Sequence, residues 1–221
     1  MRNKWLPFKR PSEQADLRIF AFPYAGGGAS SLCKLSQQMP ASIDLCPVQL
    51  PGREGRLAEP PVTELTVLGE MLVSTLGEFL HRPYALLGYS MGAIVALEFA
   101  SSISRHSLPA PTHFFACARG GPRTRPRWNH SENPTDQELI SRLVELGGTT
   151  AEVIENKELL SIFLPILRAD FALNSSYAWR DFKLECPVTV IGGLDDSAVT
   201  LDCLRNWSEV SRAPFREKML K

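Results

Sequence analysis

The sequence lacks an excess of charge of either sign, and it lacks any long apolar run. Its 221 residues hold 24 Lys and Arg against 24 Asp and Glu, so the formal net charge is zero. Without a global field that attracts polyanions, we expect neither nucleic acid nor an anionic membrane as a partner. The basic start, residues 1–10, has no uninterrupted apolar stretch like that of a secretory signal, and no later segment approaches membrane-spanning length. We therefore expect a cytoplasmic protein.

Cysteine and histidine are scarce, and neither shows the spacing of a metal site. A free thiol in an apolar strand behaves as a small hydrophobe, so we assign the scattered cysteines no chemistry. They are Cys33, Cys46, Cys117, Cys186 and Cys203. No Gly-Lys-Ser or Gly-Lys-Thr follows the glycines in Tyr24–Gly28, which excludes a phosphate-binding P-loop there. We therefore expect no metal site.

Short apolar runs alternate with helical patterns along most of the chain. Between Thr63 and Leu80, leucines recur at three- and four-residue steps and so line one face of a helix. Strands are expected at 17–22, 45–50, 84–87, 113–118, 187–191 and 215–220. Strands that alternate with helices predict an α/β fold with a mostly parallel, doubly wound sheet. The length and the 44% apolar content favour a single domain over residues 1–221.

Residues 120–180 break this alternation, because their patterns indicate helices and no strand. Thr135 and Glu138 have the spacing of a capping box, which marks the start of a helix, and the pair Gly147–Gly148 should end it. Pro165 lies within the apolar stretch Leu159–Leu167, where it should kink or split a helix. Two or three helices between sheet elements suggest a lid insertion over a site. A pair of ordinary crossover helices is the alternative.

The most specific motif is Gly88-Tyr89-Ser90-Met91-Gly92, which has an apolar run before it and a helical pattern after it. The order strand, sharp turn, helix is that of the nucleophile elbow of an α/β-hydrolase, which lifts a serine hydroxyl above the sheet. The helix start leaves the Met91 amide free to stabilise an oxyanion. We predict Ser90 as the nucleophile. A tight turn in which Gly88 and Gly92 only let the chain pass is the alternative.

The segment Tyr24–Gly28, here called the glycine loop, follows the first expected strand. An α/β-hydrolase pairs the amide after its nucleophile with a second amide from this loop. We predict that the N–H of Ala25 is this second oxyanion donor, beside that of Met91. The alternative is a glycine-rich loop that only turns the chain.

Two adjacent carboxylates, Asp195 and Asp196, follow the expected strand at 187–191. They come after Ser90 in chain order, as the acid of an α/β-hydrolase does, and that acid orients the imidazole of the catalytic histidine. Asp196 stands three residues before Val199 and fits the usual Asp-x-x-Val phrasing, so we favour it over Asp195. Both aspartates could instead cap a helix that begins near Thr200.

No histidine stands after the last expected strand, where the general base of this fold belongs. All four histidines precede Asp196, and each fits a surface or packing role better. They are His81, His106, His113 and His130. The sequence therefore has no base in the expected place.

Together these stretches resemble the type II (editing) thioesterases of polyketide and non-ribosomal peptide assembly lines. The resemblance runs through nearly the whole length and includes the glycine loop, the elbow and the two aspartates. Further matching stretches are Gln49–Arg56, Glu145–Thr149 and Phe163–Asp170. The family usually has Gly-His-Ser-Met-Gly where this chain has Tyr89. That neighbour of the serine is not the base, so activity should survive the change.

The resemblance implies that the catalytic histidine stands just after Lys221. In similar proteins, the strand that matches Phe215–Lys221 runs directly into a Gly-Gly-His-Phe segment that carries the base. We therefore expect a C-terminal segment to be missing, either from the sequence as given or from the natural protein. In the second case the protein would be unable to turn over.

The resemblance also implies a reaction, the hydrolysis of acyl groups from the phosphopantetheine arm of acyl carrier or peptidyl carrier proteins. It implies a serine acyl-enzyme and no metal or organic cofactor. We also expect a monomer. A carboxylesterase or acyltransferase would share the serine, and a non-catalytic carrier-binding protein is the alternative if the natural chain ends at Lys221. Four arginines near the expected lid could guide the carrier, although a solvated loop is the alternative. They are Arg119, Arg123, Arg125 and Arg127.

Overall fold

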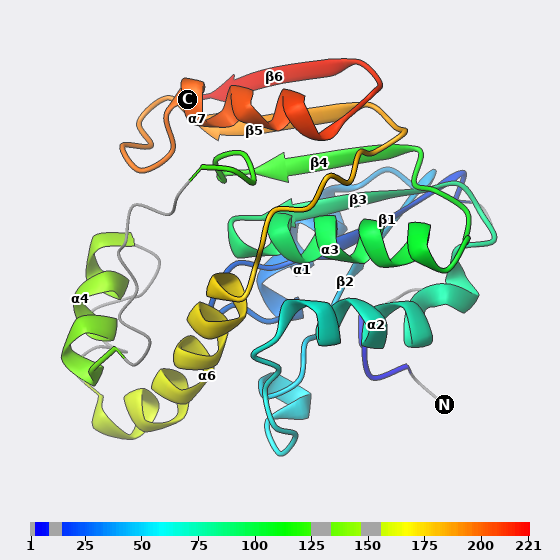
Figure 1. The fold of residues 1–221 in the computed structure, drawn as a ribbon. Coiled ribbons are helices and arrows are strands. Elements are labelled where there is room, and N and C mark those ends of the chain that lie inside the picture. Colours follow the sequence, from blue (N-terminus) through cyan, green and yellow to red (C-terminus); the bar gives the residue numbers. More distant parts are fainter. Residues whose placement is uncertain (1–2, 9–14, 125–133, 147–155) are drawn as a thin grey trace.

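A six-stranded sheet forms the centre of the computed structural model, which describes residues 3–8, 15–124, 134–146 and 156–221 (Figure 1). The strands are β1 (Leu17–Phe22), β2 (Ile43–Pro47), β3 (Tyr84–Tyr89), β4 (His113–Cys117), β5 (Val188–Gly193) and β6 (Phe215–Leu220). They lie in the order β2-β1-β3-β4-β5-β6, and every neighbouring pair is parallel. The predicted α/β fold with a parallel, doubly wound sheet is confirmed.

The strand order reverses between β1 and β3. The chain runs outward from β1 to β2, then returns to β3 on the other side of β1 and continues to β6. The loops that follow β1 and β3 therefore leave the sheet in opposite directions. Crevices that bind ligands form at this reversal, outside the carboxyl ends of the strands.

Helices cover both faces of the sheet. The α-helices are α1 (Cys33–Gln38), α2 (Leu65–Leu76), α3 (Met91–Arg105), α4 (Asp136–Leu146), α6 (Lys157–Ser175) and α7 (Leu201–Arg205). Short 3₁₀ helices are η1 (Ala29–Leu32), η2 (Glu54–Arg56), η3 (Gly77–Phe79) and η4 (Asn206–Val210). None of the described helices is long and apolar enough to cross a bilayer.

Successive residues of β1 point to opposite faces, as the two-residue period of a strand requires. Phe20 and Phe22 pack edge-to-face against Phe99 of α3. Ile19 and Ala21 belong instead to a separate apolar cluster, which includes Leu32 at the end of η1. A strand that is apolar on both faces is typical of a parallel sheet with helices on each side.

The predicted apolar face of the helix at 63–80 is confirmed. Leu65, Leu68, Leu72 and Leu76 are each at most 1% exposed, and α2 lies beside α3 (Figure 1). The strand expected at 45–50 starts and ends earlier, because its ladder with β1 runs from Ile43 to Pro47. The apolar residues that follow are buried in a loop rather than in the sheet.

Between β4 and β5 the described residues form α4 and α6, which lie off the carboxyl end of the sheet (Figure 1). The predicted capping box starts α4: the Thr135 N–H donates to Glu138 at 2.6 Å, and the Glu138 N–H donates to the Thr135 hydroxyl at 3.3 Å. The pair Gly147–Gly148, expected to end this helix, lies outside the described residues. The interpretation of this insertion as a lid stays a prediction.

Of the two effects expected of Pro165, a kink or a split, the split does not occur, because α6 continues through this residue from Lys157 to Ser175. A proline inside a helix costs about 3 kcal/mol. The apolar face of α6 offsets this cost, since Leu164 and Leu167 pack against Leu139 and Leu143 of α4. Burying one such side chain contributes about 1.5–3 kcal/mol.

Candidate active site

Ser90 lies between the end of β3 and the first residue of α3, with backbone angles φ 53° and ψ −116°. A side-chain-bearing residue rarely adopts a positive φ, so this backbone is strained, as a nucleophile elbow requires. The Ser90 N–H donates to the carbonyl of Cys117 at 2.8 Å, which joins the turn to the end of β4. Burial raises the pKa of the Cys117 thiol to about 12, so this neighbour stays protonated.

The glycines that flank the elbow have no room for a side chain. A Cβ atom on Gly88 would lie 2.2 Å from the Cα of Ala93, and one on Gly92 would lie 2.1 Å from the carbonyl oxygen of Phe22. The close approach of Gly88 to Ala93 lets α3 start directly after β3. The close approach of Gly92 to Phe22 brings the start of α3 against the end of β1, and therefore next to the glycine loop.

The two predicted oxyanion donors come from adjacent strand ends. Met91 is the first residue of α3, so its N–H has no acceptor in the preceding turn of the helix. Ala25 lies on the loop after β1, and β1 pairs with β3 so that Phe22 is opposite Gly88. Within the described part of the chain, no hydrogen bond engages the Ala25 N–H. Both amides are thus available at the reversal of the strand order.

The two aspartates differ in their surroundings. Asp195 is exposed, whereas Asp196 is partly buried and accepts the N–H groups of Ala198 and Val199 at 2.9 and 3.0 Å. Both bonds end on the same carboxylate oxygen, so the other oxygen can accept a further hydrogen bond. The alternative role as helix caps was wrong, because Thr200 caps α7.

Tyr89 is a residue of this site for which sequence reasoning gave no role beyond its departure from the family motif. It is 42% exposed, and its ring meets that of Tyr24 edge-to-face at 5.5 Å. Burial and the negative charge of Asp196 raise the pKa of its phenol. Tyr89 therefore contacts the glycine loop through Tyr24 and lies within the electrostatic influence of Asp196. No local pattern could reveal this, because the three residues lie on three different strand ends.

The described histidines lie away from this edge of the sheet. His81 precedes β3, with its Nδ1 2.8 Å from the carbonyl oxygen of Glu78. His113 begins β4 and bonds Thr189, while His106 follows the end of α3 and pairs with Glu70. Each of these residues lies near the amino-terminal ends of the strands, whereas Ser90 follows a carboxyl-terminal end. His130 lies outside the described residues.

The predicted carrier-guiding arginines differ in exposure. Burial lowers the pKa of Arg119 to about 10, whereas Arg123 is exposed and pairs with Glu209 at 3.2 Å. The Arg123 guanidinium also lies 4.5 Å from the ring centre of Trp179. Arg125 and Arg127 lie outside the described residues. Arg119 is partly buried, so Arg123 is the more exposed of the two described arginines.

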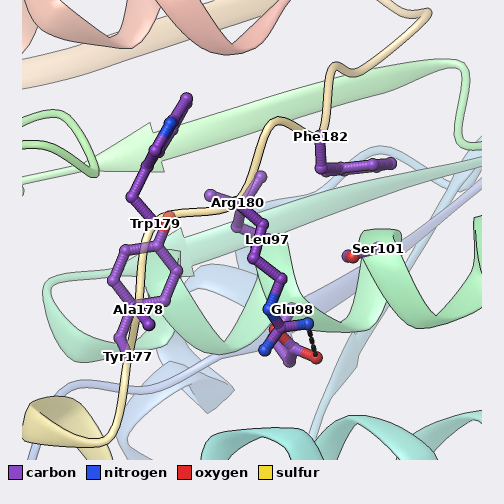
Figure 2. A pocket seen from close by; sticks show the side chains of 8 residues that line it. All are labelled: Leu97, Glu98, Ser101, Tyr177, Ala178, Trp179, Arg180 and Phe182. Atoms are coloured by element: carbon purple, nitrogen blue, oxygen red, sulfur yellow. Dashed lines mark hydrogen bonds and ion pairs between the residues drawn. The ribbon is translucent and has the colours of Figure 1, made fainter.

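A small pocket lies beside α3, between that helix and the segment 177–182 (Figure 2). The buried Glu98 faces it and forms ion pairs with Arg105 and Arg180, each at 3.2 Å. Neither Ser90 nor Asp196 lines this pocket. We therefore give it no part in the chemistry. The described residues also contain no group of three or more His, Cys, Asp or Glu that could hold a metal ion.

A parallel sheet with a strained serine after β3 and an acidic loop after β5 defines an α/β-hydrolase. The family model described as Thioesterase domain matches residues 17–221. The gramicidin S biosynthesis protein GrsT of Aneurinibacillus migulanus is 38% identical over 214 residues, which cover 96% of this chain and 84% of GrsT.

Solved structures give the same result. The type II thioesterase BorB from the borrelidin biosynthetic cluster matches with a TM-score of 0.83 and 32% identity, over 96% of this chain and 86% of that one. RedJ, a thioesterase from the prodiginine pathway of Streptomyces coelicolor, matches with a TM-score of 0.85 and 30% identity, over 100% and 90%. The chain belongs to the thioesterase family, among the type II editing thioesterases of non-ribosomal peptide and polyketide biosynthesis.

Proposed function

We propose that this protein hydrolyses acyl thioesters on the phosphopantetheine arm of carrier proteins through an acyl-enzyme on Ser90. The observation that carries the proposal is the strained backbone of Ser90 at the head of α3, beside the glycine loop. This geometry holds a hydroxyl at the strand ends with two N–H donors nearby, which is what acyl transfer requires. The phosphopantetheine belongs to the substrate.

The first half of the reaction forms the acyl-enzyme. The Ser90 oxygen attacks the thioester carbon and gives its proton to a histidine. The N–H groups of Met91 and Ala25 stabilise the resulting oxyanion. The C–S bond then breaks, and the thiolate takes the proton from the histidine as it leaves. In the second half, water attacks the acyl carbon with the histidine again as base, and the acid is released with Ser90 restored.

The positions of Asp196 and Lys221 support a histidine supplied from beyond β6. Leu220 pairs with Gly193 at the end of β5, and the Leu194 N–H donates to the Leu220 carbonyl at 2.8 Å. A residue that follows Lys221 would therefore lie at the carboxyl ends of the strands, where Asp196 also lies. Tyr89 and Ile191 lie level with Cys117 on the two sides of β4, so the strands of Ser90 and Asp196 are about 10 Å apart. This spacing leaves room for an imidazole between them.

The carrier is proposed to dock near Arg123, whose exposed charge could pair with an acidic carrier surface. Arg125 and Arg127 remain candidates for the same role, and the partly buried Arg119 is less suited to it than the exposed Arg123. A monomeric state and a cytoplasmic location are also predictions.

The test compares three substrates that carry the same acyl group: an acyl carrier protein, an acyl-CoA and a simple ester. The protein used must include the histidine expected after Lys221. We expect kcat/KM to be highest for the acyl carrier protein and lowest for the ester. The reverse order would favour a carboxylesterase. Transfer of the acyl group to an added alcohol in preference to water would favour an acyltransferase.

A further inference from the structure

We propose that Arg53 and Asp170 are positioning residues, which hold the glycine loop in the shape that aims the Ala25 N–H at the oxyanion. This inference rests on the proposed function of Ser90. The two residues lie in the stretches Gln49–Arg56 and Phe163–Asp170, which resemble the family but contain neither the nucleophile nor the acid. Neither has been placed in the chemistry described above.

The glycine loop has the geometry of a type II turn. The Gly27 N–H donates to the Tyr24 carbonyl at 2.9 Å, and Gly26 has φ +79°. These are the closing hydrogen bond and the positive φ of such a turn, with Ala25 and Gly26 as its central residues. The Tyr24 carbonyl and the Ala25 N–H belong to one peptide plane, so the turn also sets the direction of that N–H.

Asp170 of α6 fixes the central peptide of the turn, which joins Ala25 and Gly26. Its Oδ2 atom accepts the Gly26 N–H at 2.7 Å, and this N–H belongs to the peptide between Ala25 and Gly26. Turn types differ by a flip of this central peptide. A hydrogen bond to a charged carboxylate is among the stronger kinds, so Asp170 opposes the flip.

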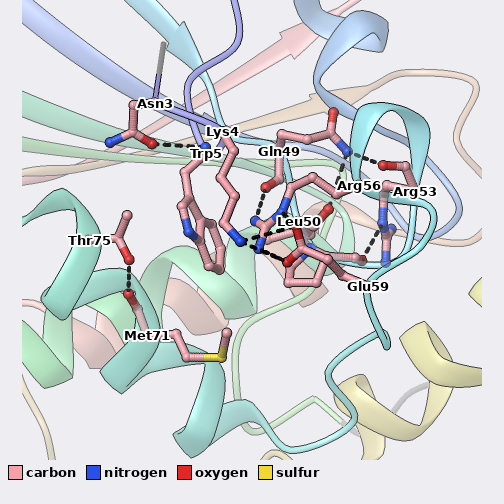
Figure 3. A network of polar contacts seen from close by, with 11 residues as sticks. Asn3, Lys4, Trp5, Gln49, Leu50, Arg53, Arg56, Glu59, Met71 and Thr75 are labelled. Atoms are coloured by element: carbon pink, nitrogen blue, oxygen red, sulfur yellow. Dashed lines mark hydrogen bonds and ion pairs between the residues drawn. The ribbon is translucent and has the colours of Figure 1, made fainter. Parts of the chain in front are cut away.

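Arg53 holds the Asp170 carboxylate in place and also binds the glycine loop directly. Its Nη1 and Nη2 atoms donate to the two oxygens of Asp170 at 2.7 and 2.6 Å, and Nη1 also donates to the Gly27 carbonyl at 3.2 Å. The Asp170 side chain is fully buried, and that of Arg53 is 4% exposed. Nearby, the amide oxygen of Gln49 accepts the Ala29 N–H at 3.0 Å, and its amide nitrogen donates to the Arg53 carbonyl (Figure 3).

Helix α6 closes over the loop with the face that carries Asp170. A Cβ atom on Gly26 would lie 2.7 Å from the ring of Phe163 and 3.1 Å from a methyl group of Leu167. Phe163, Leu167 and Asp170 share one helical face because they are spaced by four and three residues. The position of α6 is therefore coupled to the shape of the glycine loop.

The test replaces the ion pair by apolar residues in the double variant Arg53→Met/Asp170→Leu. Replacing both partners avoids an unpaired buried charge, and such exchanges are often neutral for stability. The matched control is Arg18→Met/Asp44→Leu, which removes a second buried pair, bonded at 3.1 Å, near the opposite end of β1. Both variants are made in a protein that includes the histidine proposed to follow Lys221.

Three quantities are measured for each variant: kcat and KM with an acyl-thioester, the rate of Ser90 labelling by an alkyl fluorophosphonate, and hydrogen exchange at the Gly26 amide. Loss of one oxyanion donor costs about 10²–10³-fold in kcat, so a misaimed donor should cost about 10–100-fold. We expect this fall in kcat with little change in KM, slower labelling and faster exchange at Gly26. The control should match the parent in all three.

An unchanged kcat in Arg53→Met/Asp170→Leu, or an equal fall in the control, would overturn the positioning role alone. If the parent is not labelled at Ser90, the proposed function fails, and the positioning role fails with it. Should the double variant not fold, Arg53→Lys serves instead, because it keeps the charge but loses the two-pronged contact. It should lower kcat by a smaller factor, and an unchanged kcat would again overturn the proposal.

Discussion

Gly92 at the start of α3 contacts Phe22 at the end of β1 backbone to backbone, because a Cβ atom on Gly92 would lie 2.1 Å from the Phe22 carbonyl oxygen. This contact places the strained serine beside the loop that carries the second oxyanion donor. A helix held further away would separate the two proposed donors. The glycine is therefore a requirement of the site as well as of the turn.

Gly92→Ala should both destabilise the protein and lower its activity. The added methyl group meets backbone atoms that cannot move aside without displacing α3 or β1. Overpacking of this kind costs about 2–3 kcal/mol. Urea unfolding and thioester turnover measure the two effects. Gly55→Ala is the control, since a Cβ atom there has no neighbour within 4 Å, and equal losses in both variants would contradict the account.

Asp196→Asn should reduce turnover far more than Asp195→Asn. The carboxylate of Asp196 is held by two backbone N–H groups, whereas Asp195 is exposed. Replacing the acid of a serine triad by its amide lowers kcat by about 10⁴-fold, because the histidine then adopts the wrong tautomer. Steady-state kinetics of the two variants give the ranking. The opposite ranking would assign the acid to Asp195.

Arg123→Glu should raise KM for an acyl carrier protein and leave KM for a small acyl-thioester unchanged. The charge of Arg123 is exposed, so its reversal should repel an acidic carrier without touching the chemistry. Arg212→Glu is a suitable control, because Arg212 is also an exposed arginine that pairs with a glutamate, Glu185. Equal KM values for the carrier substrate in parent and Arg123→Glu would contradict carrier docking at this position.

Acid should weaken the contribution of Glu59 to stability. Hydrogen bonds from Arg56 and Lys4 lower the pKa of Glu59 to about 2 (Figure 3). Because the folded-state pKa lies below the unfolded value, this contribution is complete above about pH 4.5 and is lost as the pH falls toward 2. The unfolding free energies of the parent and of Glu59→Gln should therefore converge over this range. A constant difference would contradict the lowered pKa.

The sequence predicted those features that depend on short, continuous segments of the chain. The elbow motif combines strand, turn and helix within a few residues, and β1 and β6 have the predicted bounds. The capping box at Thr135 is equally local. Chain order alone then suggested where the acid belongs, because Asp196 follows the next strand but one after Ser90.

Contacts between distant segments could not be predicted in this way. Arg53 and Asp170 are 117 residues apart, and nothing in either stretch indicates a buried ion pair. The contact of Tyr89 with Tyr24 likewise depends on the strand order. That α6 is not split at Pro165 has a related cause, since the local rule for proline omits the apolar packing of α6 on α4.

The central claim is that the Ser90 oxygen carries the acyl group, and intact mass with peptide mapping tests it directly. The full-length protein is mixed with an acyl carrier protein and quenched within one turnover. We predict the acyl mass on the peptide that contains Ser90, none in Ser90→Ala, and a loss of about 10⁶-fold in kcat for that variant. An acyl group on another residue, or turnover retained by Ser90→Ala, would contradict the account.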